Sequence, residues 1–185
     1  MARIPAITRE SIPEDQRAVF DVLVQDRGEV PTSGPASVLF NAPEVAQRGL
    51  ELARYLRTDT SLQPRIRELA MLLTAREKDC LFIWNAHAPV GRKEGLSDEL
   101  VDSLRDKKDL PDLAPDEAAT VAYGRELFRG NRVSQSVYNA ALAQFGVGGL
   151  TELTSLFGCY TMLAFNVNAF DVDLPPNTTE PPLPV

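Results

Sequence analysis

The sequence holds one histidine and one tryptophan, and both fall close to one of its two cysteines. Cys80, Trp84 and His87 are spaced at i, i+4 and i+7, which places their side chains along one face of a helix. A cysteine in the first turn of a helix feels the positive end of the helix dipole, which favours the thiolate. An imidazole two turns later can act as a general acid or base near neutral pH. The pattern also fits a small buried cysteine and a hydrogen-bonded core histidine, so both interpretations stay open.

The rest of the sequence does not indicate a metal site or a phosphate-binding site. One histidine and two distant cysteines cannot supply three or four zinc ligands without several carboxylates, so no metal site is expected. The glycines of residues 146–149 lack the Lys-Ser/Thr continuation of a phosphate-binding loop. The densest basic stretch, Arg105 to Lys108, is interrupted by Asp106, and we predict a solvated loop there.

Composition and charge exclude several other classes of protein. The 185 residues carry 26 acidic and 19 basic side chains, a net charge of −7, whereas a nucleic-acid surface needs clustered lysine and arginine. The longest apolar stretch, residues 156–170, contains two asparagines and is too short to span a bilayer. No apolar signal segment is seen near residue 1, and two cysteines cannot form a disulfide framework. We therefore expect a cytoplasmic protein that binds neither nucleic acid nor membrane.

Helix signals dominate and predict an all-α fold of about eight helices in a single domain of residues 1–185. All the expected helices but the last open on a capping residue or an early proline, and the last follows Gly148 and Gly149. These starts are the capping box Ser11–Glu14, Asn41-Ala-Pro-Glu44, Pro64, Asp79, Ser97, Pro115, Ser134 or Ser136, and Leu150. A loop is expected around residues 28–35, and the tail of residues 174–185 has five prolines and should be extended.

The last expected helix, from Leu150 to about Phe170, is apolar on nearly every side. Such a helix is buried either in the centre of the domain or between subunits. Because the chain is short, we expect a subunit interface.

Three segments carry a resemblance to the carboxymuconolactone decarboxylase family, whose fold is alkylhydroperoxidase D-like. They are residues 65–77 (RIRELAMLLTARE), 84–89 (WNAHAP) and 95–97 (GLS). Residues 3–5, 62–65, 160–163 and 174–175 are similar too, so the resemblance spans nearly the whole chain. It implies an all-helical fold that assembles into homo-oligomers, either trimers or hexamers.

One activity of this family is peroxide reduction through a glutamate, a Cys-x-x-Cys pair and a histidine. Carried over by motif, the glutamate falls on Glu68, the first cysteine on Cys80 and the histidine on His87. The second cysteine falls on Ile83, so no disulfide can form within this motif. Cys159 is a conceivable partner, although its place in an apolar helix gives no reason to expect it within reach.

The other activity is decarboxylation of a small carboxylated lactone without metal or organic cofactor. The resemblance then implies His87 as the general acid and Glu68 as the group that orients and polarises it. Arg65 or Arg67 would pair with a substrate carboxylate, or alternatively form ion pairs with the protein itself. Trp84 and Ile83 would line the pocket, although core packing is the slightly preferred role for Trp84. We predict this activity, with a thiol-dependent peroxidase acting through Cys80 and a catalytically silent scaffold as the alternatives.

Both catalytic schemes require the side chains of Glu68 and His87 to come into contact. In one unbroken helix these residues would stand about 28 Å apart. They can meet only if the chain turns between Ala75 and Asp79 and the two helices pack antiparallel, with Asp79 as the expected N-cap. Glu77 is the rival carboxylate if the break comes earlier.

Overall fold

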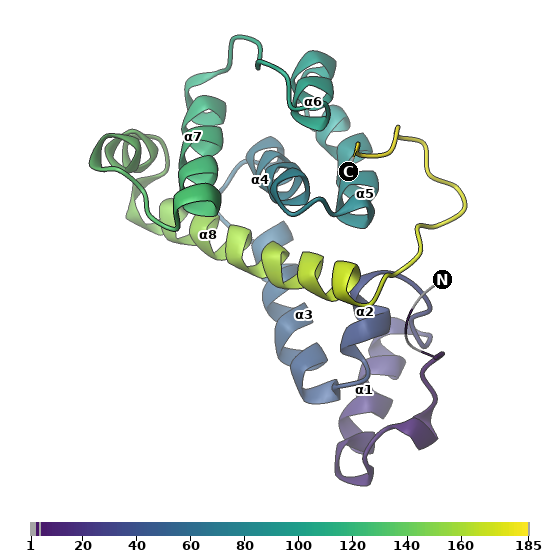
Figure 1. The fold of residues 1–185 in the computed structure, drawn as a ribbon. Helices are drawn as coiled ribbons and strands as arrows, with labels where there is room; N and C mark the ends of the chain where they lie inside the picture. The colour runs from purple at the N-terminus through teal and green to yellow at the C-terminus, as the bar shows by residue number, and fades with distance from the viewer. Residues whose placement is uncertain (1–2, 4, 185) are drawn as a thin grey trace.

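The computed structural model describes residue 3 and residues 5–184 (Figure 1). Within these residues the chain forms eight α-helices and no β-strand, which confirms the predicted all-α fold. The helices are α1 (Arg17–Arg27), α2 (Gly34–Leu39), α3 (Pro43–Thr58), α4 (Pro64–Glu77), α5 (Leu81–Lys93), α6 (Asp98–Arg105), α7 (Pro115–Gly130) and α8 (Gln135–Ala169). Prolines stand in the first turn of α2, α3, α4 and α7, where a missing backbone N–H costs nothing.

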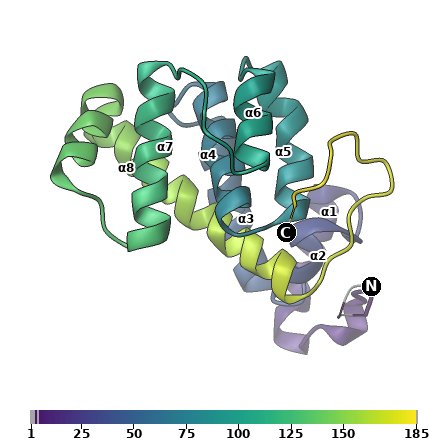
Figure 2. The same ribbon diagram turned by 45° about the horizontal axis from the view of Figure 1, so that its top comes forward.

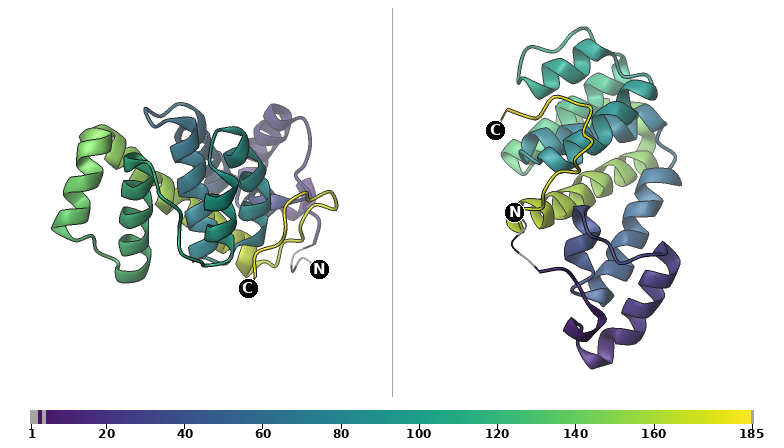
Figure 3. Two further views of the ribbon diagram at one scale, coloured as in Figure 1. Left: turned by 90° about the horizontal axis from the view of Figure 1, so that it is seen from above. Right: turned by 90° about the vertical axis from the view of Figure 1, so that its right-hand side faces the viewer.

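The long helix α8 lies between two groups of helices. Figure 1 shows α4 to α7 on one side of it and α1 to α3 on the other, and the view from the side in Figure 3 agrees. Buried side chains of α8, among them Leu153, Leu156 and Leu163, therefore meet neighbours on both sides. This placement explains why the helix is apolar around most of its circumference, because its own chain covers it from two directions.

A kink divides α8 where the sequence predicts two separate helices. Gly146 has φ 64° and ψ 178°, outside the helical region, and the helical turns continue on either side of it. Such a backbone conformation suits glycine, which has no Cβ to clash. The break therefore falls a few residues before the predicted start at Leu150.

Two expectations for the N-terminal region were wrong. Ser11 does not open a helix, because Ile12 precedes Pro13 and has extended dihedrals of φ −86° and ψ 135°, as the residue before a proline tends to. The capping box instead joins Thr8 to Ser11 around a short 3₁₀ turn, and α1 begins at Arg17. Helix α2 occupies the end of the region where a loop was expected, with Pro35 in its first turn.

The C-terminal tail is extended, as predicted, and it runs back along its own chain (Figure 1). Glu180 forms an ion pair with Arg92 at 3.3 Å, and Leu183 is buried. The carbonyl of Pro184 accepts a hydrogen bond from Arg76 at 3.2 Å. Among the described residues, no helix combines the length and apolarity needed to cross a membrane.

Candidate functional site

A corner of three residues between α4 and α5 brings the site together. Helix α4 ends at Glu77 and α5 begins at Leu81, and Asp79 between them takes the left-handed conformation with φ 47°. The N–H of Cys80 closes the corner by donating to the carbonyl of Ala75 at 2.8 Å. The two helices consequently pack antiparallel, as the sequence predicts. The N-cap is Cys80 and not Asp79, whose carboxylate pairs with Arg76 instead.

The antiparallel packing places Glu68 of α4 beside His87 of α5. The Nδ1 atom of His87 lies 2.9 Å from Oε2 of Glu68. Both side chains are largely buried, with Glu68 7% exposed. A carboxylate can only accept, so Nδ1 carries the proton of this hydrogen bond. The other ring nitrogen, Nε2, has no protein partner among the described residues and is left for a ligand.

His87 forms part of the wall of a pocket of about 420 Å³. The pocket lies between α2, α3, α5 and α8, which Figure 2 shows grouped around the C-terminal end of α8. One part of its lining is apolar and includes Leu50, Ala53, Phe82, Ile83 and Leu163. The other part is cationic and consists of Arg27, Arg54 and Arg57, all of them exposed. A pocket of this size and mixed lining suits a small organic anion.

Tyr160 of α8 holds the imidazole from a second direction. The two rings meet edge to face, with centroids 5.2 Å apart and planes at 76°. Tyr160 also lines the pocket and is almost fully buried. Burial raises the pKa of its hydroxyl well above the ordinary value, while the nearby charge of Arg57 acts in the opposite direction. Tyr160 is therefore a neutral hydrogen-bonding group at the pocket wall.

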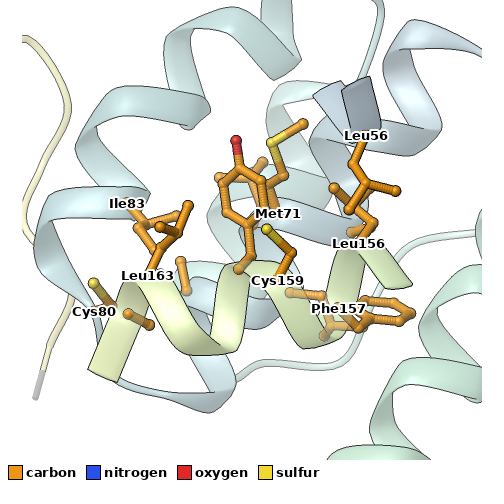
Figure 4. Close-up of a cluster of buried hydrophobic side chains, with 14 of the residues drawn as sticks. Leu56, Met71, Cys80, Ile83, Leu156, Phe157, Cys159 and Leu163 are labelled. Carbon is orange, nitrogen blue, oxygen red and sulfur yellow. The ribbon is translucent and has the colours of Figure 1, made fainter. Parts of the chain in front are cut away.

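The remaining residues of the predicted cysteine motif lie in the protein core or beside it. Ile83 lines the pocket, but Trp84 is fully buried away from it. The thiol of Cys80 is fully buried as well, and burial raises its pKa. Cys159 is also buried and its pKa is raised for the same reason. Figure 4 shows both cysteines within one cluster of buried apolar side chains, and both are free thiols.

The structure does not bring the two predicted arginines to the pocket. Arg65 forms ion pairs with Asp116 at 2.5 Å and with Glu117 at 2.9 Å, both on α7. Arg67 donates to the carbonyl of Leu62 at 2.9 Å. These arginines thus tie α4 to other parts of the chain.

Two further points concern the acidic side chains. The rival carboxylate, Glu77, binds Arg129 at the C-terminal end of α4, nine residues after the Glu68 that contacts His87. No group of three or more His, Cys, Asp or Glu side chains is placed to hold a metal ion in the part of the chain that the structure describes.

The sequence reasoning missed the arginines of α3 and the aromatic wall from α8. Leu50, Ala53, Arg54 and Arg57 follow the spacing i, i+3, i+4, i+7 and so share one helical face. This spacing could be recognised in the sequence, but the sequence did not indicate that this face of the helix lies opposite His87. Tyr160 was noted as an apolar residue of the last helix and as part of a segment similar to the family, but no role in the site was predicted for it.

No protein-family model matches the sequence, and no curated protein gives a significant match to it. Solved structures do match. An uncharacterized peroxidase-related protein from Silicibacter sp. TM1040 superposes with a TM-score of 0.71 at 13% identity, over 95% of this chain and 92% of that one. A peroxidase-related protein from Ralstonia eutropha JMP134, described as an alkylhydroperoxidase AhpD core, has a TM-score of 0.69 at 17% identity over the same shares.

A third similar structure is a variant of the debrominase Bmp8 in complex with 2,3,4-tribromopyrrole. It has a TM-score of 0.64 at 10% identity and covers 95% of each chain. At these identities the likeness shows the fold, and function has to be argued from the site itself. The resemblance drawn from the sequence is confirmed at that level.

Proposed function

This chain has the helical fold of the AhpD-like proteins, and on that fold we propose an enzyme that works without a cofactor. It transfers protons through the Glu68–His87 pair on a small carboxylated lactone, and the reaction is a decarboxylation. The observation that carries the proposal is the 2.9 Å contact between Nδ1 of His87 and Glu68 at the wall of a pocket. A silent scaffold would have no reason to keep a buried carboxylate and the sole imidazole together beside a cavity.

The chemistry assigned to the pair is the delivery of one proton to carbon. When the C–C bond to the departing carboxylate breaks, CO₂ leaves and the electron pair stays on the ring as a dienolate. Nε2 of protonated His87 gives its proton to the carbon that lost CO₂, and solvent later protonates the imidazole again. Glu68 is a positioning residue: by accepting from Nδ1 it fixes the ring orientation and stabilises the imidazolium.

The pocket lining fits such a substrate. Arg54 and Arg57 stand one helical turn apart at the rim and can pair with a carboxylate that stays on the ring. Arg54 forms an ion pair with Asp59 at 2.9 Å, whereas Arg57 makes no ion pair with a described residue and lies beside the hydroxyl of Tyr160. The apolar side chains opposite, such as Ile83 and Leu163, would exclude water from the carboxylate that leaves.

A thiol-dependent peroxidase acting through Cys80 is the second candidate, favoured by the descriptions of the similar structures. Three features of this chain weigh against it. Cys80 is fully buried, burial raises its pKa, and Ile83 stands where the second motif cysteine would be. Peroxide reduction needs an accessible thiolate, so we rank this activity below proton transfer.

We also infer a homo-oligomer, a trimer or a hexamer, from the family resemblance. Large apolar side chains that remain exposed on the described chain support it, among them Leu52, Val147 and Phe165. Light scattering of the purified protein tests this inference, and a monomer at micromolar concentration would overturn it.

The activity is tested with 4-carboxymuconolactone as the probe, by following CO₂ release. We expect turnover by the wild type, a fall of about 100-fold or more in His87→Ala, and unchanged turnover in Cys80→Ala. Hydroperoxide consumption is measured on the same three proteins. Unchanged CO₂ release by His87→Ala, or none by the wild type, would refute the assignment. Loss of hydroperoxide turnover in Cys80→Ala alone would favour the peroxidase.

The role of Glu68 has a readout independent of turnover, because the chain has one histidine and so one pair of imidazole nitrogen resonances. In the wild type, nitrogen NMR should place the proton of the neutral ring on Nδ1. Glu68→Gln should give a mixture of tautomers, with lower turnover. A proton on Nε2 in the wild type would contradict the positioning role.

A further inference from the structure

A second pocket lies on the far end of α4, away from His87. It also measures about 420 Å³ and lies between α4, α7 and the segment that follows α6. None of its lining residues lines the pocket of His87. Five cationic side chains contribute to it, namely Arg76, Lys107, Lys108, Arg125 and Arg129, against three acidic ones, Glu77, Asp79 and Asp109. In a chain of net charge −7 this is a local concentration of positive charge.

Two of the three acidic groups are already engaged by the protein. Glu77 accepts from Arg129 at 2.5 Å. Asp79 pairs with Arg76 and lies 3.6 Å from the ammonium group of Lys107. The third, Asp109, is exposed at the end of the lining segment. The carboxylates of the pocket therefore leave part of its positive charge uncompensated.

Arg125 is the cation without a partner. Its Nε is buried and makes no hydrogen bond, and its guanidinium forms no ion pair with any described residue. Burial lowers the pKa of this guanidinium and the neighbouring charge of Arg129 lowers it further, while the charge of Glu77, which Arg129 already engages, acts in the opposite direction. Taking a charge out of water is costly unless a counter-charge or hydrogen bonds replace the water. A guanidinium in this situation points to an anion from outside the chain.

We propose that this pocket binds a small multivalent oxyanion, with Arg125 as its central ligand and Lys107 and Lys108 at the rim. The guanidinium presents several donors in a planar fork, and the two lysines approach from a different segment of the chain. A phosphate group or a polycarboxylate has enough acceptor oxygens to satisfy both sets of donors at once, whereas a monovalent anion has not.

The sequence alone argues against an anion site here, because Asp106 interrupts the basic stretch from Arg105 to Lys108. In the structure Asp106 turns to Arg105 and Lys108 at 2.8 and 3.0 Å and does not line the pocket. The tertiary fold also brings Arg125 to the pocket, although this residue lies seventeen positions after Lys108 in the sequence.

Isothermal titration of the full chain with inorganic phosphate, and separately with citrate, tests the proposal. Sodium chloride at matched ionic strength serves as the blank. We expect saturable one-to-one binding of at least one multivalent anion, and the two arms distinguish phosphoryl from carboxylate chemistry. Arg125→Gln should weaken that binding by about tenfold or more. Lys93→Gln removes the same charge from an exposed site outside the pocket and should leave binding unchanged.

Lys108→Gln guards against a folding defect in Arg125→Gln, because Lys108 is exposed and should tolerate the change. It should weaken binding by a smaller factor. Equal binding by wild type and both pocket variants, or no saturable binding by the wild type, would overturn the site. A self-association abolished by Arg125→Gln, without anion binding, would also overturn it in favour of a second copy. None of these results depends on turnover at His87.

Discussion

Gly91, one turn after His87 on α5, lies directly against Glu68 on α4. A Cβ atom at Gly91 would stand 3.6 Å from Cβ of Glu68 and 3.2 Å from Cδ1 of Leu72. It would also stand 3.0 Å from Cδ1 of Leu96. Because glycine has no side chain, the two helices can approach closely at the level where the Glu68–His87 hydrogen bond forms.

Gly91→Val should therefore push α5 away from α4 and loosen that hydrogen bond. We expect a loss of about 1–3 kcal/mol in the free energy of unfolding, from overpacking. The Nδ1 signal of His87 should change in nitrogen NMR. Gly158→Val is the matched control, because Gly158 lies on α8 and a Cβ atom there would meet nothing within 4 Å. The account would be contradicted if urea unfolding showed a larger loss of stability in Gly158→Val than in Gly91→Val.

Arg57 and Arg65 should separate substrate binding from stability. Arg57 is exposed at the pocket rim, so Arg57→Gln should raise KM with little effect on kcat and on unfolding. Arg65 ties α4 to α7 through two partly buried ion pairs. Arg65→Gln should cost about 1–2 kcal/mol of stability and leave KM unchanged. A raised KM in Arg65→Gln would restore the substrate-binding role predicted from the sequence.

The two thiols should be slow to react in the folded protein. Burial raises the pKa of Cys80 and of Cys159, so the thiolate fraction near pH 8 lies below that of a free cysteine. We expect slow labelling by a thiol reagent at this pH, faster labelling as the pH rises, and rapid labelling of both thiols in urea. Cys80→Ala isolates the signal of Cys159. Fast labelling of Cys80 in the native state would instead support the thiol-dependent peroxidase.

Tyr160 should make the fold sensitive to alkaline pH. Burial raises the pKa of its hydroxyl, so above about pH 10 the unfolded tyrosine ionises while the folded one stays protonated. Stability from this group is complete below the unfolded pKa and is lost as the pH rises above it. The Tm of the wild type should therefore fall more steeply than that of Tyr160→Phe in this range. Tyr138→Phe, an exposed site on α8, should follow the wild type.

The site residues Glu68 and His87 could be named from the sequence because three of its segments resemble the carboxymuconolactone decarboxylase family, whose motif places a glutamate and a histidine at these positions. Polar residues between Ala75 and Asp79 interrupt two apolar helices, and a chain that reverses there must lay the helices side by side. The corner residue itself was not predictable in detail: Asp79 takes a left-handed conformation, which leaves the N-cap position to Cys80.

What the sequence by itself determined was therefore the helical class and the break between α4 and α5, whereas the pairing of the one imidazole with Glu68 was implied by the family resemblance. Helix periodicity, prolines and capping residues act over a few neighbours and can be read along the chain. Only the tertiary structure decided which cations face each pocket. It sent Arg65 to α7, set Arg57 and Tyr160 at the pocket of His87, and left Arg125 without an ion pair among the described residues. These outcomes depend on contacts between helices far apart in the chain, where charge and burial are set by packing rather than by sequence spacing.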